Sequence, residues 1–233
     1  NHEVVVEDIV FRIGPRINAA GRVESANKSV ELLVTTNQKM AEQVAANVNN
    51  CNNARKSIDR NITQDALKMI SSDPGFREKK ATVLYNSQWH KGVVGIVASR
   101  MIEIYYRPTI ILTASNGLAT GSARSIPGFD IYHALEECSS LLENFGGHRY
   151  AAGLTLDTKN VSEFKRKFED IVERTITEEQ LTPHIEVDSE IDFNQITPKF
   201  FRILKQFQPF GPKNLAPVFA TKNVKDTGEA RLV

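Results

Sequence analysis

Hydrophobic and polar residues follow a helical period in the first third of the chain and a strand-like period further on. Between residues 25 and 72, apolar side chains recur every three or four positions and form one stripe. Ser25 and Asn27 are suitable caps for a first helix, and Thr36 with Asn37 could start a second one. The stripe of the second helix contains Met40, Val44, Val48, Cys51, Ile58 and Ile62.

The second predicted helix is unusually long. It would contain about 35 residues and extend over about 50 Å at 1.5 Å per residue. Its apolar stripe is narrow and its other faces carry Asn, Gln, Lys and Arg, which favours a strut between lobes over a core element. The turn-forming residues SSDPG follow at positions 71–75, so we expect a domain boundary there.

The segment before these helices is predicted to be irregular. Val4, Val5 and Val6 form a short β-like run, and FRIGPRINAAGRVE (residues 11–24) follows it. Pro15 and two glycines interrupt that segment, and both residue types disfavour the interior of a helix. We therefore expect no helix within residues 1–24.

From residue 81 onward, predicted strands alternate with predicted helices. The strands are ATVLYN (81–86), TIILTAS (109–115), GLATGSARS (117–125) and AAGLTLD (151–157), and the helices are GVVGIVASRMIEIYY (92–106) and the segments 131–142 and 161–175. Strands separated by helices of this length predict an α/β domain with one mixed sheet.

A second boundary is predicted at Thr182 and Pro183. Beyond it, IEVDSEIDF (185–193) and PVFATKNV (217–224) resemble strands, and ITPKFFRILKQF (196–207) resembles a short helix. These elements are too few to close a sheet or a barrel. We expect this third unit to be truncated.

Composition narrows the class of protein. Hydrophobic residues make up 41% and charged residues 24%, which excludes collagen-like, low-complexity and wholly disordered chains. No apolar run approaches the roughly 20 residues of a membrane span, and the first residues do not resemble a signal peptide. Cys51 and Cys138 cannot build a disulfide framework, which fits the cytoplasm. The chain does not begin with Met, so we expect it to be part of a longer protein.

The net charge is only +1, from 29 basic and 28 acidic residues, but the charges are unevenly distributed. Basic residues dominate positions 77–107, and acidic residues dominate positions 163–190. An anionic ligand is therefore expected to bind the middle of the chain.

Two segments combine glycine with basic side chains. GPRINAAGR (14–22) places Arg16 and Arg22 beside small residues, and guanidinium groups can bind phosphate with two hydrogen bonds. In WHKGVVGIVASR (89–100), His90 and Lys91 stand where a helix begins, and helix N-termini attract anions. The alternatives are a linking loop whose arginines pair with carboxylates, and a tryptophan covering the core beside a surface histidine.

Two further segments lie at predicted strand ends. In GSARS (121–125), Ser122 and Arg124 share one face of a strand and could clamp an oxyanion, or they could lie on a half-exposed edge strand. In FGGHRYAAG (145–153), two glycines allow a sharp bend before His148, which could donate to phosphate or have only a structural role. The chain has no cluster of Asp and His with metal-ligand spacing and no supported Ser-His-Asp pattern.

In this order, GPRINAAGR, WHKGVVGIVASR, GSARS and FGGHRYAAG resemble the RecJ family of bacterial single-strand-specific 5′→3′ DNA exonucleases, within the DHH phosphoesterase superfamily. QPFGPKNLAPVF (208–219) resembles the start of that family's oligonucleotide-binding-fold region. The resemblance implies an α/β fold: a mixed-sheet DHH-associated domain after a long connecting helix and before a partial oligonucleotide-binding fold. It divides the chain into the end of the DHH catalytic lobe (1–24), the connecting helix (25–74), the DHH-associated domain (76–180) and a truncated oligonucleotide-binding fold (184–233).

The resemblance also implies roles for individual residues. The Gly-Gly-His motif of the family corresponds to Gly146, Gly147 and His148, which would position the scissile phosphate. The Ser-x-Arg strand corresponds to Ser122 and Arg124, which would form the pocket for the terminal 5′-phosphate together with either Arg16 or Arg22. Further DNA contacts would come from His90, Lys91 and Arg149.

By the same resemblance, manganese or magnesium would be held by a catalytic lobe upstream of residue 1, and this chain would hold no metal and be inactive alone. The expected partners are single-stranded DNA and other DNA repair proteins, with no membrane, in DNA repair and recombination. Two alternatives stay open: a phosphodiesterase of the same superfamily that acts on short oligonucleotides or cyclic dinucleotides, and a non-catalytic module that binds single-stranded nucleic acid.

Overall fold

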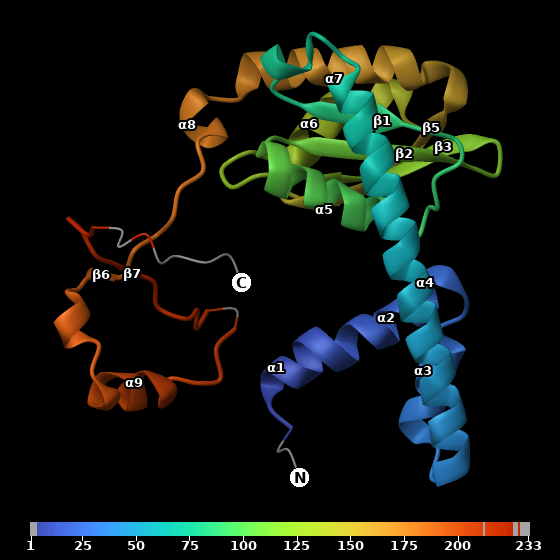
Figure 1. Ribbon diagram of the computed structural model, residues 1–233. Helices are drawn as coiled ribbons and strands as arrows, with labels where there is room; N and C mark the ends of the chain where they lie inside the picture. Colours follow the sequence, from blue (N-terminus) through green and yellow to red (C-terminus); the bar gives the residue numbers. More distant parts are fainter. Residues whose placement is uncertain (1–3, 212, 226–227, 229–233) are drawn as a thin grey trace. The chain divides into compact units, whose positions relative to one another are not determined.

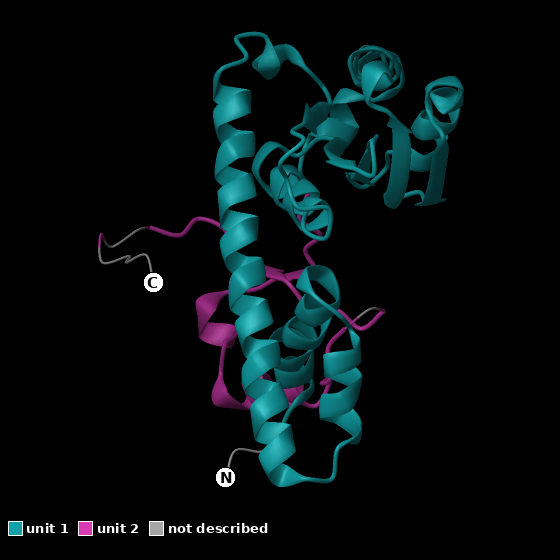
Figure 2. Cartoon of the chain, turned by 90° about the vertical axis from the view of Figure 1, so that its right-hand side faces the viewer, with its two compact units in different colours: residues 1–183 teal, residues 184–233 magenta. Residues whose placement is uncertain are grey.

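The computed structural model describes residues 4–211, 213–225 and 228. The chain forms two compact units, residues 1–183 and residues 184–233 (Figure 2). Within the described residues, no helix is both long and apolar enough to cross a membrane.

The segment before residue 24 is helical, so the expectation of an irregular start is wrong. Helix α1 (Val6–Asp8), a π-helical turn (Ile9–Ile13) and α2 (Gly14–Val23) follow one another. Pro15 lies in the first turn of α2, directly after the π-helical turn, and its fixed φ is compatible with helical backbone. Ala19 is fully buried and α2 packs on α4, so tertiary packing outweighs the helix-breaking residues.

Two further helices match the predicted pattern. Helix α3 spans Asn27–Val34, and α4 spans the 34 residues Gln38–Ser71. Asn37 caps α4, because its side chain accepts a hydrogen bond from the amide of Met40 at 3.1 Å. The C-terminal half of α4 contributes Ile62 and Ile70 to a hydrophobic core, in contrast to the expected strut.

A five-stranded mixed sheet forms the centre of the first unit, as predicted. Its strand order is β1-β2-β3-β5-β4, with β1 and β2 parallel and the other pairs antiparallel. The strands are β1 (Thr82–Tyr85), β2 (Thr109–Ser115), β3 (Leu118–Arg124), β4 (Asn144–His148) and β5 (Ala151–Asp157).

Strand β4 was not predicted. The expected bend at Gly146 and Gly147 is an edge strand, and the chain turns after it, at Arg149 and Tyr150. Glycines carry no side chain, so this segment shows no alternation of hydrophobic and polar residues.

Helices cover the two faces of the sheet unequally. Helix α5 (Val94–Tyr105) packs on β2 and β3, and α7 (Val161–Thr175) lies on the opposite side, as Figure 1 shows. Helix α6 (Ile131–Glu137) shares the core of α7. On the side of α5, Gly146 in β4 and Gly153 in β5 are exposed. We call this uncovered part of β3, β5 and β4 the open face.

The remaining elements are short. Helical turns span Phe76–Glu78, Ser139–Leu141 and Thr158–Asn160, and α8 spans Glu178–Leu181. The second unit contains β6 (Ser189–Glu190), a helical turn (Phe193–Gln195), α9 (Pro198–Lys205) and β7 (Phe219–Ala220). The helix agrees with the prediction, but each strand is only two residues long, because β6 and β7 pair over two positions.

Candidate functional site

Ser122 and Arg124 lie side by side on β3. The Nη1 atom of Arg124 donates to Ser122 Oγ at 2.6 Å and to the carbonyl oxygen of Ala123 at 2.8 Å. Both side chains face the start of α5, where a Cβ on Gly95 would lie 3.1 Å from Arg124 Nη2 and from Ser122 Oγ. The absence of a side chain at Gly95 therefore leaves room beside the guanidinium group.

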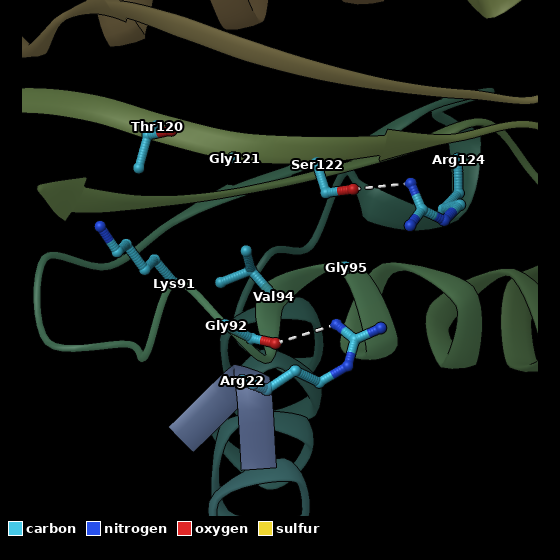
Figure 3. Close-up of a pocket in the computed structure, with 10 residues that line it drawn as sticks. Arg22, Lys91, Gly92, Val94, Gly95, Thr120, Gly121, Ser122 and Arg124 are labelled. Carbon is cyan, nitrogen blue, oxygen red and sulfur yellow. Dashed lines mark hydrogen bonds between the residues drawn. The ribbon is translucent and has the colours of Figure 1, made fainter. Parts of the chain in front are cut away.

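Arg22 reaches the same place from α2. Its Nη1 atom donates to the carbonyl oxygen of Gly92 at 3.1 Å, and Figure 3 shows Arg22 and Arg124 extending toward one cavity from opposite sides. We call this cavity of about 390 Å³ the arginine pocket. It is lined by Gly21, Arg22, Lys91, Gly92, Val94, Gly95, Thr120, Gly121, Ser122 and Arg124.

Positive charge in the arginine pocket is not balanced by acidic residues in its lining. Arg22, Lys91 and Arg124 line it, and no carboxylate is among the described lining residues. Burial, and then the positive charge of Arg22, lower the pKa of Arg124. Arginine nevertheless stays protonated in proteins, so the pocket retains its charge and attracts an anion. A phosphate group matches two guanidinium forks and a hydroxyl group.

The basic segment 77–107 was expected to bind an anion, but two of its lysines form ion pairs within the chain. Lys79 pairs with Asp73 at 2.8 Å, and Lys80 lies 3.1 Å from both Glu173 and Glu178. Nearby carboxylates thus neutralise Lys79 and Lys80. Of that segment, Lys91 reaches the arginine pocket.

Arg16 and His90 lie outside the lining of the arginine pocket. Arg16 donates to Asn49 Oδ1 on α4 at 3.1 Å, whereas Arg22 enters the pocket. The Nδ1 atom of His90 accepts the amide hydrogen of Gly92 at 3.1 Å and so stabilises the turn before α5. Trp89 is buried in the core, which agrees with the alternative interpretation of that segment.

The glycine-histidine segment lies on the same face of the sheet as Arg124. Arg124 pairs with Ala151 on β5, which pairs with His148 on β4, and partners across an antiparallel sheet project to one side. Ser122 is related to Gly146 in the same way, through Gly153. Two strand spacings amount to roughly 10 Å. The pairing register therefore unites the third and fourth sequence segments on one surface.

His148 and Arg149 have local partners. The Nδ1 atom of His148 accepts the amide hydrogen of Tyr150 at 3.2 Å. Arg149 donates to the carbonyl oxygen of Gly128 at 3.2 Å and lies 5.6 Å from the ring centre of Tyr150. Arg149 is thus directed to the loop before α6, not to the arginine pocket.

A second cavity of about 280 Å³ continues across the open face, and we call it the strand hollow. It is lined by Thr120, Gly121, Asn144, Phe145, Gly146, Gly153, Leu154 and Thr155. It shares Thr120 and Gly121 with the arginine pocket, so the two cavities adjoin. Thr120 could have been predicted as part of the site, because it is two residues from Ser122 and shares its face of the strand. Asn144 could not, because it belongs to β4, which was not predicted.

Comparison with known proteins assigns this architecture. The DHHA1 domain model matches residues 78–174, and the RecJ OB domain model matches residues 187–233. The single-stranded-DNA-specific exonuclease RecJ of Bacillus subtilis (strain 168) is 36% identical over 219 residues, covering 93% of this chain and 28% of that protein. The chain resembles the C-terminal part of RecJ proteins. The resemblance inferred from the four segments is therefore confirmed.

Other RecJ proteins show the same relationship. The RecJ exonuclease of Dickeya dadantii (strain 3937) is 34% identical over 93% of this chain and 39% of its own length. The crystal structure of RecJ with Mg²⁺ from Thermus thermophilus has a TM-score of 0.81 and 31% identity, over 91% of this chain and 32% of that chain. The chain thus spans between 28% and 39% of these RecJ proteins.

Solved RecJ structures contain Mg²⁺ or Mn²⁺, so a divalent cation belongs to the full-length family. Among the described residues of this chain, no group of three or more His, Cys, Asp or Glu side chains is arranged to hold a metal ion. The arginine pocket is lined by cations, which repel a metal ion. The residues that the structure describes therefore do not fit a metal ion.

Proposed function

We propose that this chain is the strand-binding part of a 5′→3′ single-stranded DNA exonuclease and that the arginine pocket holds the terminal 5′-phosphate. The observation that carries the proposal is the pair Arg22 and Arg124, which converge on one cavity without an acidic partner in its lining. Of the two arginines that the sequence left open, Arg22 is the one that we assign to the phosphate. Ser122 and Lys91 would complete the set of donors.

The open face would carry the strand onward from the terminal phosphate. Gly153 and Gly146 present no side chains, so a sugar-phosphate backbone can lie close to the strands. The Nδ1 atom of His148 is occupied as an acceptor, and the neutral ring therefore carries its proton on Nε2. His148 would donate that hydrogen to the next phosphate and position the scissile bond.

Polarity and strand selectivity follow from this arrangement. A pocket that accepts a doubly charged terminal phosphate discriminates against an internal phosphodiester, and so fixes which end of the strand enters. The oligonucleotide-binding region after residue 187 would hold more of the strand, since such folds bind single strands through basic grooves and base stacking.

Hydrolysis would require a divalent cation held by another part of the protein, which activates water and neutralises charge on the phosphate. We place the full protein in DNA repair and recombination, in the cytoplasm, with other repair proteins as partners. The chain alone is expected to bind strands without cleaving them.

The test compares binding of 3′-labelled single-stranded oligonucleotides with a 5′-phosphate or a 5′-hydroxyl end, by fluorescence anisotropy at fixed salt. We expect the phosphate to strengthen binding about tenfold to 100-fold, which corresponds to the net effect of about one hydrogen bond to a charged group. Arg124→Ala should abolish this preference. Arg166→Ala removes the same charge from an exposed position on α7 and should keep it.

Equal affinity of the wild-type chain for the two oligonucleotides would contradict the assignment of the pocket. Equal loss of preference in both variants would show a general effect of charge instead of a site. Degradation of the oligonucleotides by the purified chain with Mn²⁺ would refute the expectation that it only binds.

A further inference from the structure

The strand hollow contains a row of polar side chains with no assigned role. Thr120 on β3 pairs with Thr155 on β5, and Thr155 pairs with Asn144 on β4. Residues directly opposite each other project to the same face, so the three side chains form one row across the sheet. Thr120 lies two residues from Ser122, and the row therefore lies on the open face beside the arginine pocket.

The side chains of this row have hydrogen-bonding groups that are not used within the chain. Thr120 Oγ1 lies 3.3 Å from Thr155 Oγ1 and donates to the carbonyl oxygen of Leu154 at 3.3 Å. When Thr120 donates to Leu154, Thr155 donates to Thr120, so both lone pairs of Thr155 Oγ1 and one lone pair of Thr120 Oγ1 stay available as acceptors. The exposed side chain of Asn144 bonds to no other described residue and adds an amide donor and an acceptor.

The chemistry of the hollow differs from that of the arginine pocket. Its lining contains no charged side chain among the described residues, so it offers no counter-charge to a second phosphate. Hydroxyl and amide groups match the neutral polar parts of a nucleoside, namely the sugar oxygens and the edge of a base. Its volume of about 280 Å³ is close to the lower end of ordinary small-molecule sites.

We propose that the strand hollow is the nucleoside subsite for the terminal nucleotide, with Thr155, Thr120 and Asn144 contacting its sugar and base. The shared residues Thr120 and Gly121 join the hollow to the arginine pocket, so one ligand can occupy both. The inference rests on the proposed function, because the phosphate in the arginine pocket anchors the ligand. It follows that the chain binds a deoxynucleoside 5′-monophosphate more tightly than inorganic phosphate.

The experiment is isothermal titration of the full 233-residue chain with inorganic phosphate and with 2′-deoxyadenosine 5′-monophosphate. Thr155→Val removes the hydroxyl group while keeping a β-branched side chain for the strand, and Thr155→Ser restores the hydroxyl group. We expect Thr155→Val to weaken nucleotide binding by about threefold to tenfold, the effect of one hydrogen bond, without changing phosphate binding. Thr155→Ser should retain nucleotide affinity.

The outcomes separate this inference from the proposed function. If the wild-type chain binds phosphate but gains nothing from the nucleoside, the hollow is not a subsite, although the pocket stands. Unchanged nucleotide affinity in Thr155→Val overturns the inference, and so does an equal loss of affinity for both ligands in that variant. If the wild-type chain binds neither ligand, the proposed function fails and the inference falls with it.

Discussion

Gly147 and Gly146 are neighbours in β4, but the structure predicts opposite effects of an alanine at each position. Gly147 has a φ of +148°, and a Cβ there would lie 2.3 Å from the carbonyl oxygen of Ala151 and 2.5 Å from the Cα of Ala152. Both atoms belong to the backbone of the paired strand β5 and cannot rotate away. A Cβ on Gly146 would have no atom within 4 Å.

The cost of Gly147→Ala has two parts. A residue other than glycine with this φ costs about 1–3 kcal/mol. Relieving the overlap with β5 displaces the strand at a further cost of about 1–3 kcal/mol, as in other overpacked sites. We therefore expect the free energy of unfolding to fall by about 2–6 kcal/mol. Gly146→Ala should leave it unchanged or raise it by about 0.5 kcal/mol, because alanine restricts the unfolded chain.

Urea unfolding measures this difference, and the fluorescence of Trp89 reports it. Trp89 is the single tryptophan of the chain and is 5% exposed in the core of the first unit. Because β4 is an edge strand, it could also detach without global unfolding, so amide exchange in residues 144–148 is measured in parallel. The reasoning is refuted if Gly147→Ala matches Gly146→Ala both in unfolding midpoint and in amide protection of β4.

Three other predictions concern the pocket, the helix interface and pH. Arg22→Ala should reduce the salt dependence of single-strand binding by about 0.7 in the log–log slope, while Arg16→Ala should not; equal slopes would argue against the choice of Arg22. Asp59 on α4 is buried, and its Oδ2 atom lies 2.8 Å from Nη2 of Arg100 on α5. The side chain of Arg100 is 44% exposed. Asp59→Ala should therefore cost about 1–3 kcal/mol, less than a fully buried pair, and an unchanged urea midpoint would contradict this. Burial raises the pKa of Cys138 to about 11, above the 9.0 of a free thiol, so stability should fall as pH rises from 9 to 11, by at most about 3 kcal/mol. Cys138→Ala should remove that part of the pH dependence of the unfolding free energy, and a profile identical to wild type would refute it.

Local patterns were sufficient for most of the first unit. The three- and four-residue spacing predicted α4, and continuous or alternating apolar runs predicted β1, β2, β3 and β5. They failed where local preference and tertiary packing disagree. Pro15 and its neighbouring glycines oppose a helix, but α2 forms because its small residues pack against α4.

The site was predictable only in part, for the same reason. The two-residue period of a strand places Ser122 and Arg124 on one face without knowledge of the fold. The choice between Arg16 and Arg22 depends on how α2 meets the turn before α5, which no local pattern contains. The alignment of His148 with Arg124 depends on the pairing of β4 with β5, and β4 gave no signal.

The hydrogen bond between Arg22 and Gly92 joins residues that are 70 positions apart in the sequence. The pocket is therefore complete only in a protein that includes α2. A shortened protein that begins at α3 would keep all five strands of the mixed sheet and the α4 residues that complete the core beneath α5. It would nevertheless lack one of the two guanidinium groups. Such a truncated domain should still associate with polyanions, but it should have lost the ability to tell the beginning of a strand from its middle.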